Sequence, residues 1–385
     1  MIAENSIARI SSQEACDIYR NTGSHDLFQM GRDGAHRLHP TGIRTYVVER
    51  NINYTNVCLT GCKFCAFQKS PKSKSAYTLS DQQIGEKIEA LLKLGGTQIL
   101  LQGGLNPDLP MNWYEEMLKD IKDHFPDLHI HGFSPEEICF FSDLFELPVQ
   151  TVLARFQEAG LDSIPGAGGE ILVDRVRDLI APEKCKTGQW LEVMRQAHKL
   201  GISTSATMMF GHVESVKERI EHLECVRELQ DDSLAAREEN PRLGCFTAFI
   251  CWPFQPGHTP LSRFEKFNPL DQKPRKENQI LLAGAFEQLK MTALARIYLD
   301  NIPNIQASWV TQGPKIGQLS LLVGCNDMGS LMMEENVVSA VGTTFSMKLH
   351  QLRDLITTSG YTPVQRDYYY RYLENPETTL SPAAR

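Results

Sequence analysis

Short apolar or β-branched runs alternate with amphipathic segments from about residue 50 to the C-terminal third, and this alternation constrains the fold most strongly. Such a pattern predicts βα units that join into a parallel sheet. The strand-like runs lie at residues 51–57, 98–102, 128–133, 163–164, 203–210, 246–252, 305–310 and 319–323. Eight units of this kind predict an α/β fold, a (βα)8 TIM-type barrel.

Helix signals occupy the gaps between these runs. Ser80 with Gln83, and Ser215 with Glu218, fit the capping box in which two side chains satisfy free amides of the first helical turn. A third amphipathic stretch, residues 190–200, stops at a glycine, which tolerates a left-handed helix end. We therefore expect helices after residues 80 and 215, and a third helix that ends near residue 200.

A single domain explains the pattern better than two domains. We expect an N-terminal extension at 1–45 that packs on the barrel, a barrel at 46–345 and a C-terminal extension at 346–385. The most polar stretch, 231–242, is predicted to be an exposed loop, and 263–279 a second surface connection.

Charge and hydropathy exclude several classes of partner. Thirty-nine Lys and Arg against 47 Asp and Glu give a net charge of −8, which argues against a broad surface for nucleic acid or anionic membrane. Residues 1–14 lack a continuous apolar segment of the secretory kind, and no run is apolar enough to insert into a membrane. We expect a cytoplasmic protein.

In a (βα)8 barrel the functional residues lie on loops after the C-terminal ends of the strands. Three cysteines follow the first predicted strand, and the segments that follow later strands are rich in glycine and polar side chains. After the second to seventh strands come Gly103-Gly104, Ser134, 166–170, His212, Phe254-Gln255 and Thr311-Gln312.

Cys58, Cys62 and Cys65 crowd into eight residues, whereas the other seven cysteines are scattered and are interpreted as small buried hydrophobic residues. Closely spaced thiolates attract a soft metal. Structural zinc usually takes four protein ligands, whereas an iron–sulfur cluster held by three cysteines leaves one iron without a protein ligand. The alternatives are a zinc site completed by His129 or His131 and an electron-transfer cluster completed by a distant cysteine.

The spacing Cys58-x3-Cys62-x2-Cys65, with Phe64 before the last cysteine, resembles the signature of radical S-adenosylmethionine enzymes. The resemblance implies a [4Fe-4S] cluster on the three cysteines and S-adenosylmethionine as cosubstrate. Reductive cleavage of the sulfonium C–S bond then gives methionine and a 5′-deoxyadenosyl radical, which removes a hydrogen atom from the substrate. A flavodoxin or ferredoxin is the expected electron donor.

The same resemblance suggests which other residues contact the cosubstrate. Gln102-Gly103-Gly104 is similar to the Gly-Gly-Glu element of the superfamily, but Leu105 replaces the acidic residue, so backbone atoms would bind the ammonium group. Glu170, at the end of GAGGE, suits the ribose hydroxyls. Glycine clusters of this kind also form ordinary tight βα turns. The expected cofactor contacts are Phe64, Gln102, Gly103, Gly104, Ser134 and Glu170.

Longer segments resemble one branch of the superfamily, the enzymes of the futalosine route to menaquinone and the related deazaflavin synthases. These segments are N-x-N-x-T-N-x-C at 51–58, AGLDSIPGAGGEIL at 159–172 and ATMMFGHVES at 206–215. Within the branch, WPFQP at 252–256, ASWVTQGPK at 307–315 and NDMGSLMMEENVVSA at 326–340 resemble the cyclic dehypoxanthinylfutalosine synthases. The aminofutalosine synthases are the alternative family. Gln68 departs from the tyrosine common at its position.

The implied reaction abstracts the ribosyl C4′ hydrogen of dehypoxanthine futalosine, whose sugar radical attacks the benzoate ring. His212 has a suitable intrinsic pKa for the base that removes the ring proton, although a structural histidine is an equal alternative. Glu170 and Glu335 are competitors for that role. Expected substrate contacts are Gln255, Trp309, Thr311 and Gln312, with Lys315 as a further donor. An alternative of another class is a non-catalytic iron–sulfur or zinc-binding protein that binds partners through 231–243.

Overall fold

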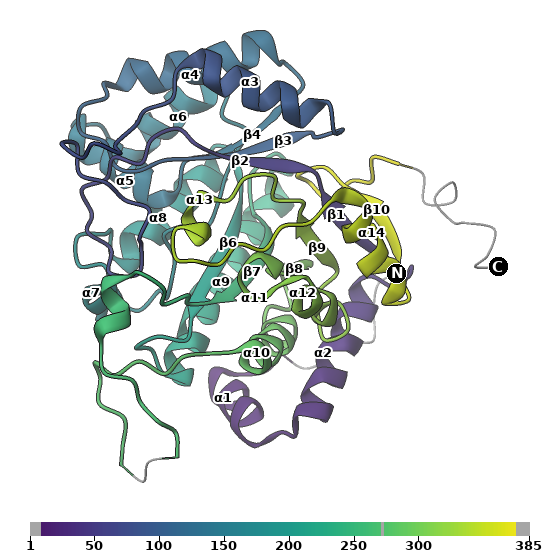
Figure 1. The fold of residues 1–385 in the computed structure, drawn as a ribbon. Helices are drawn as coiled ribbons and strands as arrows, with labels where there is room; N and C mark the ends of the chain where they lie inside the picture. Colours follow the sequence, from purple (N-terminus) through teal and green to yellow (C-terminus); the bar gives the residue numbers. More distant parts are fainter. Residues whose placement is uncertain (1–8, 271–272, 375–385) are drawn as a thin grey trace.

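A computed structural model describes residues 9–270 and 273–374 and contains a curled, wholly parallel sheet surrounded by helices (Figure 1). The strands are hydrogen-bonded in the order β10-β1-β9-β8-β7-β6-β5-β4-β3-β2. Their bounds are β1 (Ile43–Val47), β2 (Glu49–Asn53), β3 (Gln98–Gln102), β4 (His129–Gly132), β5 (Ser163–Ile164), β6 (Ser203–Phe210), β7 (Phe246–Pro253), β8 (Asn304–Gln306), β9 (Asp327–Ser330) and β10 (Thr362–Gln365).

Strands β1 and β2, which pair with different neighbours, are joined along the chain by one residue, Val48. β1 pairs with β9, β2 pairs with β3, and only Val48 separates β1 from β2 along the chain. The Val48 carbonyl also accepts a hydrogen bond from the Thr97 amide at 3.3 Å. The predicted TIM-type α/β architecture is therefore confirmed, with a curled sheet of ten strands in place of the expected eight.

Most of the helices lie outside the sheet and connect its strands, as the parallel pairing requires (Figure 1). The longer helices are α1 (Ser12–Asn21), α2 (Ser24–Leu38), α3 (Asp81–Leu92), α4 (Met111–His124), α5 (Pro135–Leu144), α6 (Val149–Ala159), α8 (Thr187–Lys199), α9 (Val216–Glu239), α10 (Ala285–Tyr298) and α14 (Leu349–Thr358). The shorter ones are α7 (Asp174–Ile180), α11 (Trp309–Gln312), α12 (Pro314–Ser320), α13 (Asn336–Ser339) and the 3-10 turn η1 (Pro260–Arg263).

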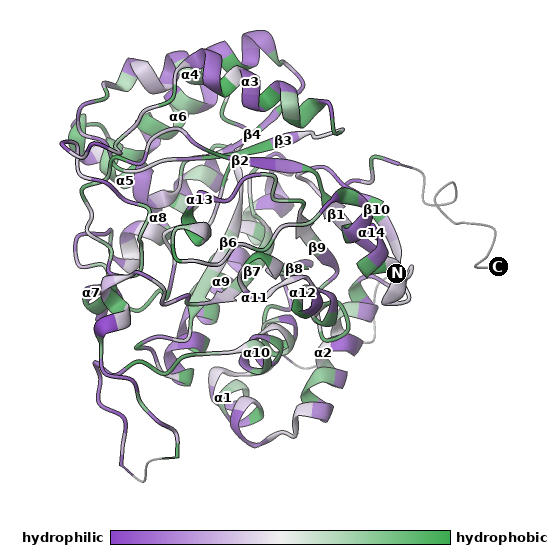
Figure 2. Ribbon diagram, viewed as in Figure 1, coloured by the Kyte–Doolittle hydropathy of each residue, from purple (hydrophilic) through white to green (hydrophobic). Residues whose placement is uncertain are grey.

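The predicted helix starts are confirmed. Ser80 and Ser215 cap α3 and α9, and each side chain accepts a hydrogen bond from the amide three residues later. α8 ends at Lys199, close to the expected residue 200. Polar and apolar residues alternate around the outer helices α3 and α4 (Figure 2), and their buried positions face the sheet.

Three of the predicted strands differ from the structure, and the first of them, 51–57, corresponds to β2 at 49–53. Residues 319–323 end helix α12 and form the turn after it, and the eighth strand is instead β9. A short apolar run does not distinguish a strand from the last turn of a helix, and the polar sequence of β9 carries no strand signal. Likewise, 305–310 splits into β8 and the beginning of α11.

The predicted loop at 231–242 is largely helical, which corrects the sequence interpretation. α9 continues to Glu239, and only the residues after it turn back toward β7. A polar composition is compatible with a helix whose outer face is solvated, and that possibility was missed. The segment 263–279, as far as it is described, runs outside the sheet as a polar excursion (Figure 2).

Both ends of the described chain contact the barrel. α1 packs on α9, and α2 packs on α10. At the other end, β10 extends the sheet beside β1, and the ring of Tyr368 stacks on His129 with 4.4 Å between centroids. The division into 1–45, 46–345 and 346–385 stays a prediction, and residues 1–8 and 375–385 lie outside the described part.

Candidate active site

A cavity of about 430 Å³ opens among the loops that follow the strands and continues into the barrel. Its size is typical of a small-molecule site. The lining includes most of the sequence-predicted site residues: Cys58, Cys62, Phe64, Cys65, Gln102, Gly103, Gly104, Ser134, Glu170, Gln255, Trp309 and Thr311. The parallel strands therefore gather side chains from six separate loops, as the barrel prediction required.

The cysteine loop follows β2 and carries three free thiols at the cavity wall. The hydroxyl of Thr60 lies between two of them, 3.1 Å from the sulfur of Cys58 and 3.3 Å from that of Cys62. The amide of Cys65 donates to the carbonyl of Cys62 at 3.2 Å, and Gly61 has a φ of 55°, which a side chain would disfavour. Burial raises the pKa of the Cys62 thiol to about 12.

The donor set fits an iron–sulfur cluster better than zinc. Within residues 9–270 and 273–374, no group of three or more His, Cys, Asp or Glu side chains is already spaced as a metal site. Of the two histidines considered as zinc ligands, only His131 lines the cavity, and the rings of both His129 and His131 bond the hydroxyl of Ser163 at 2.7 Å. His129 is in register with Gln98 at the start of β3, whereas the cysteines follow the ends of the strands. Three thiols on one loop remain, the number that leaves one iron of a cluster open.

Gly103 and Gly104 close the wall beside the cysteine loop. A Cβ on Gly103 would lie 2.3 Å from the ring of Tyr54, and one on Gly104 would lie 2.1 Å from the carbonyl oxygen of Val57. Close packing therefore explains both glycines. It also brings their backbone to the cavity, as expected for contacts through backbone atoms.

Glu170 lines the cavity in an unusual backbone conformation, with a φ of 35°. One carboxylate oxygen pairs with Lys184 at 3.1 Å, and Arg177 lies 3.9 Å from the other, Oε2, which is buried without a hydrogen-bond partner. Burial by itself would lower the pKa of Lys184, but the Glu170 carboxylate raises it well above its ordinary value. The ammonium of Lys184 also lies 5.3 Å from the ring centroid of Phe64. An unpaired buried acceptor in this position fits a ligand with hydroxyl donors.

Ser134 caps α5 rather than presenting a free hydroxyl. Its amide and hydroxyl donate to one oxygen of Glu137 at 2.7 and 2.8 Å. The other oxygen accepts from the hydroxyl of Tyr54 at 2.6 Å and from the amide of Gly103 at 3.0 Å. Burial raises the pKa of Glu137 despite these donors. Ser134 and Glu137 thus hold the wall in shape.

Three of the predicted substrate contacts line the cavity, and two do not. Trp309 lines it with its indole nitrogen bonded to the Ser330 carbonyl at 2.9 Å, and Gln255 and Thr311 line it as well. Gln312 does not line the cavity and bonds only the Thr311 carbonyl in the described structure. Lys315 is also absent from the lining.

His212 is enclosed in the protein rather than placed on the cavity wall. Its side chain is fully buried, with Nε2 3.0 Å from the Met209 carbonyl and Nδ1 3.0 Å from the carboxylate of Glu214. Glu214 also pairs with Arg219 at 2.7 Å. Burial alone would raise the pKa of Glu214, but His212 and Arg219 hold it well below its ordinary value. This geometry supports the structural alternative for His212 that the sequence left open.

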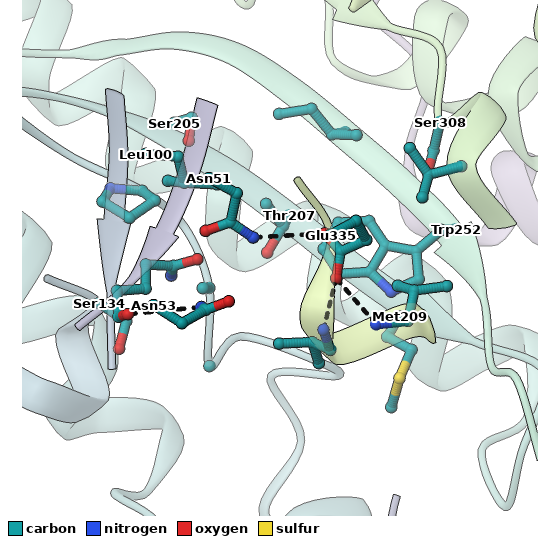
Figure 3. Close-up of a pocket in the computed structure, with 18 of the residues that line it drawn as sticks. Asn51, Asn53, Leu100, Ser134, Ser205, Thr207, Met209, Trp252, Ser308 and Glu335 are labelled. Atoms are coloured by element: carbon teal, nitrogen blue, oxygen red, sulfur yellow. Dashed lines mark hydrogen bonds between the residues drawn. The ribbon is translucent and has the colours of Figure 1, made fainter. Parts of the chain in front are cut away.

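Several lining residues were missed by the sequence reasoning. Figure 3 shows Asn51 and Asn53 on β2 and Thr207 on β6, all facing the cavity from within strands rather than from loops. Lys184 lies on a loop that follows α7, where no strand-end rule applies. For Glu137 a signal existed, because Ser134 and Glu137 have the capping-box spacing.

Comparisons with known proteins agree with this architecture. Residues 52–226 match the family described as the radical SAM superfamily, and residues 244–379 match the CofH/MqnC C-terminal region. The solved structure of methylornithine synthase superposes with a TM-score of 0.65 at 15% identity and covers 97% of both chains. The FeFe-hydrogenase maturase HydG from Carboxydothermus hydrogenoformans gives 0.68 at 16% identity, over 94% of this chain and 78% of its own. These two likenesses concern the fold alone.

Among curated proteins, the chain is 40% identical over 369 residues to the cyclic dehypoxanthine futalosine synthase of Halalkalibacterium halodurans, covering 96% of this chain and 93% of the relative. The synthase of the same name from Streptomyces coelicolor is 41% identical, over 95% and 86%. A 5-amino-6-(D-ribitylamino)uracil–L-tyrosine 4-hydroxyphenyl transferase of Methanosarcina acetivorans is 39% identical, over 86% and 82%. With three cysteines on a barrel loop and relatives at this identity, the chain belongs to the radical SAM superfamily, in the family that joins these synthases and transferases.

Proposed function

We propose that this protein is a cyclic dehypoxanthine futalosine synthase that closes the ring of dehypoxanthine futalosine in menaquinone biosynthesis. The observation that carries the proposal is the match to two such synthases at 40–41% identity over 369 residues, 95–96% of the chain. The transferases match a shorter stretch of 329–333 residues. The three segments at 252–256, 307–315 and 326–340 also resemble the synthases.

We assign Cys58, Cys62 and Cys65 as the residues that hold the cluster, and S-adenosylmethionine as its cosubstrate. Together they supply, when bound, the 5′-deoxyadenosyl radical that abstracts hydrogen. The unpaired Oε2 of Glu170 would accept a hydrogen bond from a ribose hydroxyl of the cosubstrate, and Lys184 holds this carboxylate in place. The backbone of Gly103 and Gly104 and the ring of Phe64 complete the wall on that side.

On the substrate side, apolar residues exclude water and orient the molecule. Met209, Phe254 and Trp309 line the cavity. Gln255 and Thr311 are the proposed polar contacts of the substrate. Because the radical and the aromatic ring belong to one molecule, a well-oriented geometry contributes about 7–11 kcal/mol to lowering the barrier. The main work of the protein is therefore to hold the folded substrate and to shield the radical.

The test is an anaerobic assay of the reconstituted, reduced protein with three candidate substrates in separate reactions. We expect cyclic product and 5′-deoxyadenosine from dehypoxanthine futalosine. No product from this compound, with turnover of the enolpyruvyl benzoate ether that aminofutalosine synthases use, would overturn the proposal. A protein that forms no 5′-deoxyadenosine with any substrate would instead support a non-catalytic metal-binding role.

A second candidate function is the transfer of the tyrosine 4-hydroxyphenyl group to 5-amino-6-(D-ribitylamino)uracil. It is favoured by the 38–39% identity to transferases of that name, which cover 85–86% of the chain. The third reaction of the assay therefore contains tyrosine and this uracil. Product in that reaction alone would establish the transferase.

The electron donor, a flavodoxin or ferredoxin, and the cytoplasmic location are proposed with the synthase activity. In the described part of the chain, no helix combines the length and apolar character needed to cross a bilayer.

A further inference from the structure

One carboxyl group at the mouth of the cavity has no role in the mechanism above. Glu335 follows β9, precedes α13 and lines the cavity. Its Oε1 accepts from the amides of Val337 and Val338, both at 2.8 Å, and its Oε2 accepts from the side-chain amide of Asn51 at 3.3 Å. A carboxylate oxygen accepts two hydrogen bonds, so Oε2 has capacity for one more donor.

The other carboxyl groups of the lining are committed elsewhere. Both oxygens of Glu136 and both of Glu137 accept protein donors. Glu170 is paired with Lys184 on the side of the cysteine loop. Glu49 begins β2, at the end of the barrel opposite the loops. Glu335 also accepts three protein donors, but its Oε2 takes only the one from Asn51, and the unpaired Oδ1 of that same Asn51 lies in the cavity wall at the loop end.

Asn51 adds an independent observation. Its Nδ2 is used on Glu335, while its Oδ1 is buried without a hydrogen-bond partner, and the residue is only 4% exposed. Leaving a buried acceptor unpaired costs about 1–3 kcal/mol. Because Asn51 lines the cavity, a ligand that brings a hydroxyl donor removes this cost. A ribosyl hydroxyl of the substrate is such a donor.

The surroundings of Glu335 favour proton exchange. In Figure 3 its carboxyl group and the Asn51 amide point toward each other, with Trp252 and Met209 among the labelled side chains around the cavity. Burial raises the pKa of Glu335, against the hydrogen bonds that lower it, and the neighbouring Glu334 raises it further. The nearby cations Arg50 and Lys87 both pair with Glu334 at 2.7 Å.

We infer that Glu335, oriented by Asn51, accepts the aromatic proton after ring closure, an inference that rests on the proposed function. The C–H bond at the tetrahedral ring carbon of the cyclised adduct radical breaks, and its proton forms an O–H bond at Oε2 of Glu335. The electron pair of that bond stays in the adduct, which becomes a radical anion. Its surplus electron leaves separately to a one-electron carrier of the iron–sulfur or flavin class. Asn51 is a positioning residue that fixes the carboxylate and takes a sugar hydroxyl.

The test compares Glu335→Gln with the wild type under anaerobic turnover of dehypoxanthine futalosine. Glutamine keeps the size of the side chain but does not accept the proton. We expect product formation to fall by about 100-fold or more, as for loss of a general base, with KM changed little. Formation of 5′-deoxyadenosine should continue, so the ratio of 5′-deoxyadenosine to cyclic product rises. A structural or substrate-binding role would lower both together.

The pH profile provides a second readout. In the wild type, kcat for cyclic product should rise with pH as Glu335 loses its proton, with an inflection above the ordinary glutamate pKa, and then level off. Glu335→Gln should lack this inflection. An infrared titration of carboxyl groups in the unloaded protein should show the same late-ionising group in the wild type and not in the variant.

Glu334→Gln is the matched control, because it removes the ion pairs to Arg50 and Lys87 from the same segment and keeps the Glu335 carboxyl group, whose pKa should fall without the neighbouring charge. We expect its ratio of 5′-deoxyadenosine to product to equal that of the wild type. An unchanged ratio in Glu335→Gln, or the same increase in Glu334→Gln, overturns the inference while the synthase activity stands. A wild type that leaves dehypoxanthine futalosine unconverted overturns the proposed function and the inference with it.

Discussion

Gly103 and Gly104 show how single residues shape the wall of the cavity. Gly104 packs against the carbonyl of Val57, directly before Cys58, and Gly103 packs against the ring of Tyr54. A side chain at either position would need the cysteine loop or the aromatic ring to move. The position of the cysteines therefore depends on the absence of two Cβ atoms on the neighbouring strand end.

Gly104→Ala should lower the free energy of unfolding by about 1–3 kcal/mol, because the new Cβ overpacks against backbone 2.1 Å away. Gly85→Ala is the control, since that helical position has nothing within 4 Å, and alanine there should stabilise by about 0.5–1 kcal/mol. Urea unfolding of both variants checks this. Equal effects of the two substitutions would contradict the packing argument.

Cys62→Ser tests the assignment of the cluster ligands. We expect the variant, after anaerobic reconstitution, to lose most bound iron and sulfide together with the visible absorption of the cluster, because one thiolate ligand is missing. Cys225→Ser, on α9 and outside the cavity lining, should keep both. Iron and sulfide analysis with absorption spectra measures the difference, and a cluster-loaded Cys62→Ser would refute the assignment.

At the level of secondary-structure elements, the segment after β10 places a charged side chain in the interior of the barrel. Arg366 follows β10 and pairs with Asp327 of β9 at 2.8 Å, and both side chains are almost fully buried. Asp327 and other acidic neighbours raise the pKa of Arg366 despite burial, which opposes them. The hydroxyl of Thr45 on β1 bonds the same aspartate at 2.5 Å. This contact joins three elements that are far apart in sequence.

Asp327→Asn should lower the free energy of unfolding by about 3–5 kcal/mol, because it leaves the buried Arg366 without a counter-charge. Asp354→Asn, at an exposed position of α14, should change it by less than about 0.5 kcal/mol. Chemical denaturation of the two variants gives the comparison. A small effect at Asp327 would show that the charge of Arg366 is compensated by other groups.

On the scale of the whole molecule, the barrel buries histidines as neutral groups. Burial lowers the pKa of His198 and of His222 to about 3. Nδ1 of His222 accepts a hydrogen bond from the Leu172 amide at 3.0 Å, which protonation at that atom would break. In the unfolded chain a histidine titrates near about 6.5. The contribution of these two neutral histidines to the free energy of unfolding is therefore fully present above about pH 6.5 and is lost as the pH falls toward about 3.

The free energy of unfolding should therefore decrease between about pH 6.5 and about pH 4, by about 1.4 kcal/mol per pH unit for each such histidine. His222→Gln should have a lower free energy of unfolding at neutral pH. The slope of that free energy against pH should be smaller by the contribution of one histidine, about 1.4 kcal/mol per pH unit. Urea unfolding at several pH values tests the slope. An unchanged slope would mean that His222 does not remain neutral in the folded protein.

The bounds of several helices and strands were predictable from the sequence, whereas the contacts of individual side chains were not. The bounds of β3, β5 and β6 and the caps of α3 and α9 follow from local periodicity and capping residues, so they were predictable. The apolar run at 319–323 was not, because local pattern does not separate a strand from a helix end. His212 and Gln312 occupied suitable strand-end positions in the sequence, yet their side chains are directed to other partners.

The succession of βα units and the three cysteines on one loop follow from local order, because both depend on residues close together in the chain. The contacts of Asn51 with Glu335, of Lys184 with Glu170 and of Arg366 with Asp327 arise only in the folded chain. The two residues of these pairs are 284, 14 and 39 positions apart in the sequence, and the strand register and the curl of the sheet bring them together. Long-range contacts of this kind have no local signature.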